Sequence, residues 1–211
     1  METAAIAQLL KPFIELDESR LRAISIYIDL LLKWNARINL TAIRNPNEIV
    51  QRHFGESLFA AKHLLKQNLP KTAIDLGSGA GFPGVPLAML APEVQVTLIE
   101  AQQRKATFLR ELVRVLNLKN VQVFDQRAEN YPEAADLVML RAVEKFEEAL
   151  ETAVRLAKPG GSIALMIGSG QIELARNLSS EVSWEKPIQV PCSSARELLV
   201  GIKSAKVEQD L

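Results

Sequence analysis

A glycine-rich segment, Asp75-Leu-Gly-Ser-Gly-Ala-Gly-Phe-Pro-Gly84, constrains the fold of this chain more than any other part of the sequence. It lies between two apolar runs, Thr72-Ala-Ile74 and Val85-Pro-Leu-Ala-Met-Leu90. This order predicts a strand, a tight glycine turn and the first turns of a helix. Glycine tolerates positive φ and has no Cβ that would keep a ligand away from the backbone. We therefore expect a pocket of inward-pointing N–H groups at the carboxyl edge of a sheet, where nucleoside-type cofactors bind.

From residue 71 onward the sequence alternates between apolar, strand-like runs and helical stretches. Strands are predicted at 72–76, 94–100, 121–124, 135–140, 162–167, 188–192 and 198–202. Helices are predicted between them, near 84–91, 102–116, 146–156 and 171–178. This alternation predicts an α/β fold with a doubly wound, mostly parallel sheet of seven strands.

The first part of the chain has a different pattern, with helical periodicity and few strand-like runs. Residues 1–70 are predicted to form a helical extension, and residues 71–211 the cofactor-binding domain. Apolar side chains recur at three- and four-residue steps from Leu21 to Leu32, which predicts an amphipathic helix from about Asp17, its N-cap, to Asn35. Pro46 is placed to begin a further helix that runs through His53.

Composition limits the classes of partner. The 25 basic residues equal the 25 acidic ones, so no global positive field indicates a nucleic acid, although a local basic face stays open. A single cysteine, Cys192, cannot form an intrachain disulfide, which suits a reducing cytoplasm. We expect neither a signal peptide nor a membrane span. Two histidines and one cysteine without ligand spacing predict no metal site, and we expect a cytoplasmic monomer.

Acidic residues near the glycines bear on the choice of cofactor. The dinucleotide fingerprint G-x-G-x-x-G, weak on its own, is matched by Gly79, Gly81 and Gly84. Asp75 would repel a pyrophosphate, and Glu100, at the end of the second strand, can hold two ribose hydroxyls. Polar groups for an adenine edge follow in Arg127-Ala-Glu129 and Asp136. Together these residues favour S-adenosylmethionine, with a nicotinamide dehydrogenase as the rival interpretation.

Several segments resemble one known family. They are Leu32-Lys-Trp-Asn-Ala-Arg-Ile-Asn-Leu-Thr-Ala-Ile-Arg44, Arg52-His53, Asp75–Gly84, Arg104-Lys-Ala-Thr-Phe-Leu-Arg110, Arg127-Ala-Glu129 and Arg141-Ala142. The chain resembles, over nearly its whole length, the bacterial small-subunit ribosomal RNA methyltransferase G family, also called the glucose-inhibited division protein B family. The resemblance implies a class I, Rossmann-like S-adenosylmethionine-dependent methyltransferase whose last strand is antiparallel. It also implies methylation of N7 of one guanine in a decoding-region stem-loop of 16S rRNA.

The resemblance also assigns site residues by position. It places cofactor contacts at Gly77, Phe82, Ala128, Glu129 and Arg141, and the reasoning from the residues adds Asp75, Gly79, Gly81 and Glu100. Because guanine N7 already carries a lone pair, the reaction needs no general base, and alignment of the reacting atoms can carry catalysis. We therefore name no catalytic residue. Arg141 is the candidate for positioning the guanine or a flanking phosphate, with a structural ion pair to Glu129 or Asp136 as the alternative.

RNA contacts are predicted in the N-terminal extension, at Lys33, Asn35, Arg37, Asn39, Arg44 and Arg52; solvated helix faces are the alternative for the cations. Trp34 is expected in the core, and His53 packed or hydrogen-bonded. Three positions depart from the family's pattern: Glu56 where Asp is usual, Ile167 where Lys is usual, and Glu197 where His is usual. The missing cation at 167 bears on RNA docking. Two rival functions stay open: a methyltransferase with another substrate, and a cofactor-binding RNA assembly factor without turnover.

Overall fold

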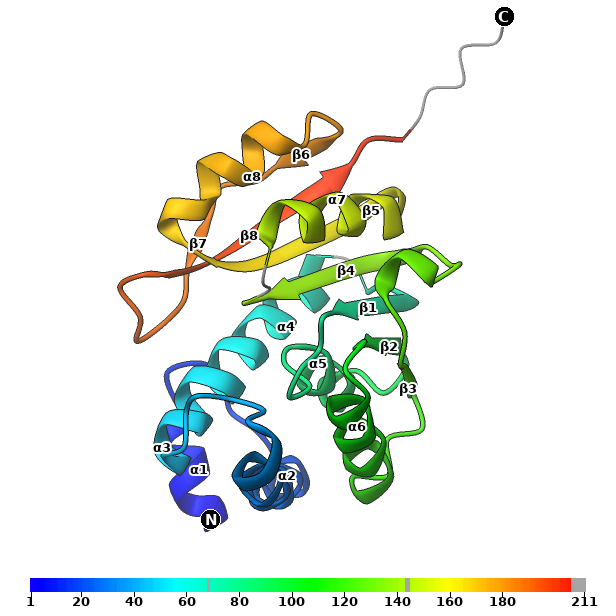
Figure 1. Cartoon of the computed structure of the whole chain (residues 1–211). Helices are drawn as coiled ribbons and strands as arrows, with labels where there is room; N and C mark the ends of the chain where they lie inside the picture. Colours follow the sequence, from blue (N-terminus) through cyan, green and yellow to red (C-terminus); the bar gives the residue numbers. More distant parts are fainter. Residues whose placement is uncertain (68, 143–144, 206–211) are drawn as a thin grey trace, which may run out of the picture.

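One mixed sheet organises the chain, and the computed structural model describes residues 1–67, 69–142 and 145–205 (Figure 1). Within these residues the strand order is β3-β2-β1-β4-β5-β8-β6, with β7 also paired to β8. The bounds are β1 (Thr72–Leu76), β2 (Gln95–Ile99), β3 (Val121–Phe124), β4 (Ala135–Arg141), β5 (Ala157–Gly168), β6 (Val182–Trp184), β7 (Ile188–Gln189) and β8 (Arg196–Lys203). Strands β1 to β5 are parallel, and β8 runs antiparallel to β5.

The predicted doubly wound, mostly parallel sheet is confirmed, but its outer edge differs in detail. Both β6 and β7 pair with β8, at Gly201–Lys203 and at 197–198 respectively, so eight described strands fill the seven expected positions. The three residues of β6 are too few to show an alternating pattern, and the sequence did not predict them. Strand β5 begins at Ala157 rather than 162. The expected turn at 159–161 lies within the strand as a bulge, where Gly160 has a φ of 75° and the register with β4 shifts between Ala135 and Leu137.

Helices cover both faces of the sheet (Figure 1). On one face lie α5 (Gly84–Leu90) and α6 (Gln103–Val115), together with the N-terminal helices α1 (Thr3–Leu10), α2 (Glu18–Ile38) and α4 (Glu56–Gln67). On the other face lie α7 (Phe146–Leu156) and α8 (Ile172–Leu178). None of the helices in the described ranges is long and apolar enough to cross a membrane.

The N-terminal extension follows the predicted start signals and then departs from them. Asp17 caps α2 by accepting a hydrogen bond from the backbone N–H of Arg20 (2.8 Å), as predicted. Pro46 begins the short helix α3 (Pro46–Glu48), which continues as a π-helical segment, Ile49–Gly55, and then as α4. A π-helical segment is rare and has no sequence signature of its own, so the predicted helix through His53 was correct in place but not in type.

The extension and the sheet share one hydrophobic core. Ile24 of α2 and Phe54 of the π-helical segment lie in the same buried cluster as Val96 and Leu98 of β2. A second cluster fills the space between the sheet and α7 and α8. Residues on both sides of position 70 therefore belong to one packed unit.

Strand alternation assigns the ends of β5 and β8 to opposite faces. Met166 and Leu198, which are paired in register, lie in the core on the side of the N-terminal helices. Ile167 and Leu199 lie in the core on the side of α7 and α8. Because side chains alternate along a strand, Arg196 belongs to the first face and Glu197 to the second.

Candidate cofactor and nucleic-acid site

A cavity of about 620 Å³ opens at the carboxyl ends of β1, β2 and β4. The chain winds outward from β1 to β3 and then returns to β4, so the cavity lies beside the topological switch point of the sheet. Its walls come from the glycine loop, the ends of β2, β3 and β4, helix α7, the N-terminal extension and the start of β8. Of the predicted cofactor residues, it is lined by Gly77, Gly79, Phe82, Glu100, Ala128, Glu129 and Arg141.

The glycine loop adopts the left-handed backbone that was predicted. Gly77, Gly79 and Gly81 have φ values of 70°, 54° and 92°. Gly77 and Gly79 line the cavity, whereas Gly81 faces the N-terminal helices: a Cβ there would lie 2.5 Å from the hydroxyl oxygen of Tyr27. Gly81 is therefore required for packing against α2 and does not contact the cavity.

Several amides of the glycine loop are used within the protein, whereas the sequence predicted that they would be free toward the cavity. Four of them donate within the chain: Ser78 to the carbonyl of Ile99 (3.0 Å), Gly79 to Glu100 Oε2 (3.0 Å), Gly81 to the carbonyl of Ser78 (2.7 Å) and Gly84 to Asp75 Oδ2 (2.9 Å). The prediction of a pocket of free N–H groups was wrong for these positions. Amides that are already bonded offer little to a pyrophosphate, and this favours a cofactor without one.

Asp75 supports the loop from below. Its side chain is 1 % exposed and does not line the cavity, contrary to the prediction of a ligand contact. Oδ2 accepts the hydrogen bond from Gly84, and Oδ1 has no hydrogen-bond partner among the described residues. Burial raises the pKa of this carboxyl to about 7, because desolvation penalises the charged form.

Glu100 occupies the position predicted for a ribose contact. Its Oε2 accepts from Gly79 and its Oε1 accepts from the backbone N–H of Gln102 (2.8 Å), which fixes the carboxylate between the two loops. Each carboxylate oxygen has a second lone pair, so the group can still accept hydrogen bonds from two hydroxyls.

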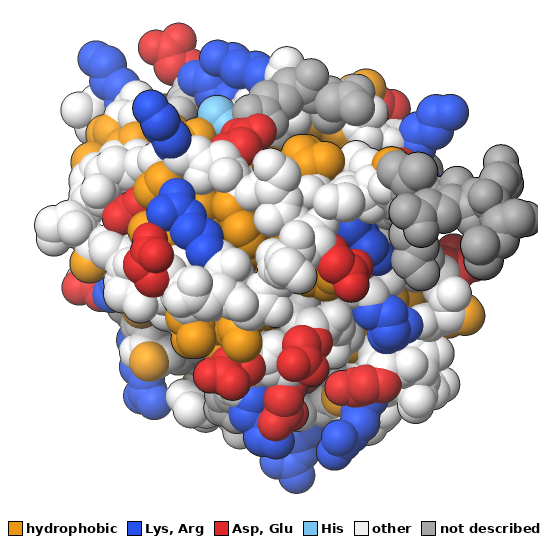
Figure 2. Space-filling model, turned by 90° about the horizontal axis from the view of Figure 1, so that it is seen from above, with side chains coloured by type: hydrophobic (Ala, Val, Ile, Leu, Met, Phe, Trp, Pro, Cys, Tyr) orange, Lys and Arg blue, Asp and Glu red, His pale blue; other side chains and the backbone are white. Residues whose placement is uncertain are grey.

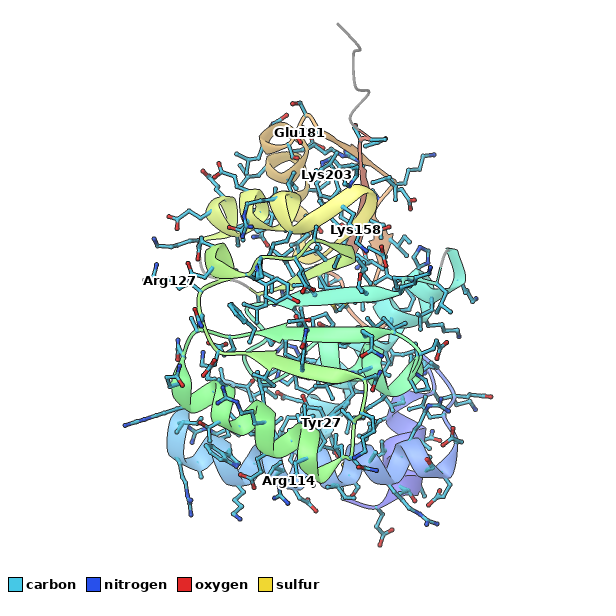
Figure 3. The ribbon with its side chains drawn as sticks, turned by 90° about the vertical axis from the view of Figure 1, so that its right-hand side faces the viewer. Tyr27, Arg114, Arg127, Lys158, Glu181 and Lys203 are labelled. Carbon is cyan, nitrogen blue, oxygen red and sulfur yellow. The ribbon has the colours of Figure 1, made fainter. Side chains whose placement is uncertain are left out.

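The turn after β3 forms the same end of the cavity. Ala128 and Glu129 lie in a short 3₁₀ turn there, and the carbonyl of Ala128 accepts from Arg155 (2.7 Å). Asp136 was expected nearby but lies at the start of β4, where it binds the backbone N–H of Thr72 (2.9 Å) and the ammonium of Lys158 (2.7 Å). Figure 3 shows Arg127 and Lys158 at opposite ends of the strands, so Asp136 cannot reach an adenine.

An aromatic column supports the cavity at Phe82. Its ring stacks on Tyr27 (5.1 Å between centroids) and on His53 (4.9 Å), and Phe54 contacts its edge. His53 is hydrogen-bonded through Nε2 to the Thr41 hydroxyl (2.8 Å), as predicted for a packed histidine. Burial, with Arg141 and Arg52 nearby, lowers the pKa of His53 to about 3, so the imidazole is neutral at physiological pH.

Arg141 ends β4 and is held by the N-terminal extension. It forms an ion pair with Glu56 Oε2 (2.8 Å) and also donates to the backbone carbonyl of Arg52. The side chains of Arg141 and Glu56 are only 12 % and 7 % exposed. Glu129 and Asp136, the predicted ion-pair partners, are not the ones used. Glu56, which departs from the family's pattern, is thus the ion-pair partner of the arginine that lines the cavity.

The predicted RNA contacts divide into three groups. Asn35 is buried: its amide donates to the carbonyl of Thr41 and accepts from the Thr41 N–H (both 2.9 Å), so the predicted contact with RNA was wrong. Arg52 is exposed and lines the cavity. The other predicted residues are exposed but do not line it: Lys33, Arg37, Asn39 and Arg44.

Trp34 lies between α2 and α6, as expected for a core residue. Its indole N–H donates to Glu111 (3.0 Å), and its ring meets Phe108 edge-on. Sequence reasoning did not predict three cations that line the cavity, Lys105, Lys145 and Arg196. Only Lys105 had a signal, since it lies in a segment that carries the family resemblance.

The other two departures lie together. Ile167 and Glu197 are paired in register between β5 and β8, and Ile167 is 4 % exposed in the core beneath α7 and α8. Neither residue lines the cavity. A lysine at position 167 would therefore lie on the face of the sheet covered by α7 and α8, on the side away from the N-terminal helices.

Charge is mixed on the surface where the sheet's β6 edge and α8 lie. Figure 2 shows acidic and basic side chains interspersed there, in keeping with the equal totals. Across the described ranges, no three His, Cys, Asp or Glu side chains are grouped so that they could hold a metal ion.

The fold belongs to a class seen in solved methyltransferases. A S-adenosylmethionine-dependent methyltransferase from Aquifex aeolicus superposes with a TM-score of 0.58 at 20 % identity, over 75 % of this chain and 94 % of the other. The M. jannaschii protein TYW2, solved in complex with AdoMet, gives 0.55 at 19 % identity, over 72 % of this chain and 75 % of the other. The architecture is that of the class I, Rossmann-like methyltransferase fold.

Sequence relatives define the family. The profile of rRNA small subunit methyltransferase G matches residues 20–199. A relative named ribosomal RNA small subunit methyltransferase G from Roseiflexus castenholzii is 38 % identical over 206 residues, or 91 % of this chain and 87 % of its own length. The protein of that name from Xylella fastidiosa is 38 % identical over 90 % of both chains. The chain belongs to the rRNA small subunit methyltransferase G family.

Proposed function

We propose that this protein transfers a methyl group from S-adenosylmethionine to N7 of a guanine in 16S rRNA. The observation that carries the cofactor assignment is Glu100, fixed at the end of β2 with free lone pairs beside a loop whose amides are largely used internally. A dinucleotide would need those amides for its pyrophosphate. The choice of 16S rRNA rests on the family to which the chain belongs.

The cavity walls suit the parts of this cofactor. Glu100 is placed to accept hydrogen bonds from the ribose, and Ala128 and Glu129 border the space for the adenine. Arg141 is suited to receive the carboxylate of the amino-acid part, because its side chain lines the cavity and is only 12 % exposed. The bound cofactor supplies an activated methyl group on a positively charged sulfur.

The protein's contribution to the reaction is alignment. N7 of guanine has a lone pair in its neutral form, so no side chain has to remove a proton before attack. The neutral imidazole of His53, bonded to Thr41 and stacked on Phe82, is suited to shaping the wall and not to acting as a base. Holding the purine and the methyl group in line converts a bimolecular encounter into a reaction within one complex.

We further propose a cytoplasmic monomer that acts on rRNA or on the small subunit without a membrane partner. The thiol of Cys192 is exposed, which suits a reducing compartment.

Mass mapping of methylated nucleotides tests the proposal. Naked 16S rRNA and small ribosomal subunits would each be incubated with the protein and labelled S-adenosylmethionine. We expect one new 7-methylguanosine, in at least one of the two substrates, that is absent when the protein is omitted. Binding of the cofactor without methylation of either substrate would contradict the proposal and would support an assembly factor.

A further inference from the structure

Three arginines from distant parts of the sequence meet at one end of the cavity. Arg52 lies on the π-helical segment, Arg141 ends β4, and Arg196 begins β8; all three line the cavity. Burial lowers the pKa of Arg141, Glu56 opposes that shift, and the nearby positive charges of Arg196 and Arg52 add to it. The opposite end of the cavity is formed by Glu100 and the turn after β3.

The charges at this end do not balance. Glu56 neutralises Arg141, but neither Arg52 nor Arg196 forms a salt bridge within the described ranges of the chain. Like charges held near one another repel, and they do so more strongly where water is partly excluded. Both guanidinium groups are therefore open to pairing with an anionic ligand.

The β7–β8 hairpin fixes the direction of Arg196. Its backbone N–H donates to the Ser193 hydroxyl (3.1 Å), and its carbonyl accepts from the N–H of Val190 (3.0 Å). Across the sheet its register partner is Gly168, which has no side chain to cover it. Strand alternation places Arg196 on the face of the N-terminal helices, the face that carries Arg52, and Glu197 on the other.

We propose that Arg52 and Arg196 form a phosphate clamp, which holds the RNA backbone on both sides of the nucleotide to be methylated. RNA would then enter between the π-helical segment and the β7–β8 hairpin, opposite the cofactor's ribose at Glu100. Guanidinium groups suit this task, because their planar fork binds phosphate oxygens in pairs. The proposal rests on the proposed function for the identity of the RNA. It differs from the sequence prediction, which located the RNA contacts in residues 33–52 alone.

A carboxylate is the other anion available, in the amino-acid part of the cofactor. The buried, paired Arg141 serves that group, whereas Arg52 is exposed and Arg196 half-buried at the mouth. The test must therefore measure the two anions separately.

The experiment compares Arg52→Ala, Arg196→Ala and the double variant with Arg114→Ala. Arg114 is a matched control: it is exposed, and it lies nine residues, or about 14 Å along α6, beyond the cavity residue Lys105 (Figure 3). Arg52→Ala retains the backbone carbonyl that binds Arg141. Circular dichroism would check that each variant is folded.

Binding of a fluorescent single-stranded RNA oligonucleotide would be measured over a range of salt concentrations, and binding of S-adenosylhomocysteine by calorimetry. For single strands, the slope of log K against log salt is about 0.7 per phosphate contact. We expect each single variant to reduce the slope by about 0.7 and the double variant by about 1.4. Arg114→Ala should leave the slope unchanged, and S-adenosylhomocysteine affinity should stay within about twofold in all four variants.

Two binding results would overturn the clamp: an unchanged slope in the double variant, or a loss of S-adenosylhomocysteine affinity as large as the loss of RNA affinity. Methyl transfer to 16S rRNA by the unaltered protein separates this failure from failure of the proposed function. If that transfer is absent while RNA binding still depends on the two arginines, the clamp stands and the proposed function falls. If transfer occurs at an undiminished rate in the double variant, the clamp falls and the proposed function stands.

Discussion

At the scale of single residues, the buried pair between Arg141 and Glu56 joins the sheet to the N-terminal extension. Removing one member of a buried pair leaves the other charged and without a partner, which costs about 3–5 kcal/mol in typical proteins. Replacing both with apolar groups of similar size often costs little. This difference allows a structural role for Arg141 to be separated from a role in binding.

We predict that Arg141→Met lowers the free energy of unfolding by about 3 kcal/mol, since it leaves Glu56 buried and charged. The double variant Arg141→Met, Glu56→Leu should recover most of that loss. S-adenosylhomocysteine affinity should stay reduced at least tenfold in both. Urea unfolding and calorimetry measure the two quantities; affinity that returned together with stability would show that Arg141 has only a structural role.

Asp75 predicts a pH dependence. Its pKa, about 7 in the folded protein against 3.8 when unfolded, means that the folded carboxyl keeps its proton between pH 4 and 7 while the unfolded one loses it. The contribution to stability is therefore complete below pH 4 and is lost as the pH rises through 7, by up to about 4 kcal/mol.

Asp75→Asn should remove that dependence. The depressed pKa of His53 acts with the opposite sign, because its contribution is present above pH 6.5 and is lost as the pH falls. The useful quantity is thus the difference in unfolding free energy between the original protein and Asp75→Asn, measured by urea unfolding at pH 4.5 and 7.5. We expect the unfolding free energy of the original protein to fall relative to that of Asp75→Asn as the pH rises. A difference that stays constant between pH 4.5 and 7.5 would refute the raised pKa of Asp75.

At the scale of elements, two glycines of the glycine loop, Gly79 and Gly81, share a backbone conformation but differ in the space around them. Gly79 and Gly81 both have positive φ, which costs a residue with a Cβ about 1–2 kcal/mol. A Cβ at Gly79 would meet nothing closer than 3.8 Å, whereas one at Gly81 would lie 2.5 Å from Tyr27.

We predict that Gly79→Ala costs about 1–2 kcal/mol of stability, the backbone penalty alone. Gly81→Ala should cost about 2–5 kcal/mol, because overpacking against Tyr27 adds to that penalty. Thermal or urea unfolding measures the loss of stability in each variant, and the two losses can be compared directly because both changes are glycine to alanine. Equal losses would contradict the packing described for α2 and the loop.

Elements that follow local rules were predictable. Strand–loop–helix patterns gave β1, α5, β2 and α6 nearly to the residue, and parallel strands bring their carboxyl ends to one edge, so the place of Glu100 followed. A local sequence pattern does not indicate which residues from other parts of the chain a side chain will contact in the folded protein. The contact of Arg141 with Glu56 and the position of Arg196 beside the cavity both depend on packing between distant segments.

At the scale of the whole molecule, one core runs from α1 through the sheet. Two tryptophans report on distant parts of the molecule. Trp34 packs against this core between α2 and α6, whereas Trp184, in β6 at the edge of the sheet, packs against the second cluster, on the face of α7 and α8. A single cooperative unit would lose both environments together.

We predict coincident unfolding at the two positions. The variants Trp34→Phe and Trp184→Phe each leave one tryptophan, and their fluorescence transitions in urea should have the same midpoint after correction for the change in stability that each variant causes. Circular dichroism of each variant provides the control for global unfolding. Separate transitions would show that residues 1–70 form an independent domain.

The hydroxyl of Tyr27 binds the carbonyl of Ala80, and its ring lies on Phe82. One side chain of α2 therefore contacts the glycine loop at two residues, through a hydrogen bond to Ala80 and through stacking on Phe82. Chimaeras between relatives should tolerate exchange of the helix and the loop only when both come from the same parent. We therefore expect residue 27 and the loop that it supports to vary together among relatives.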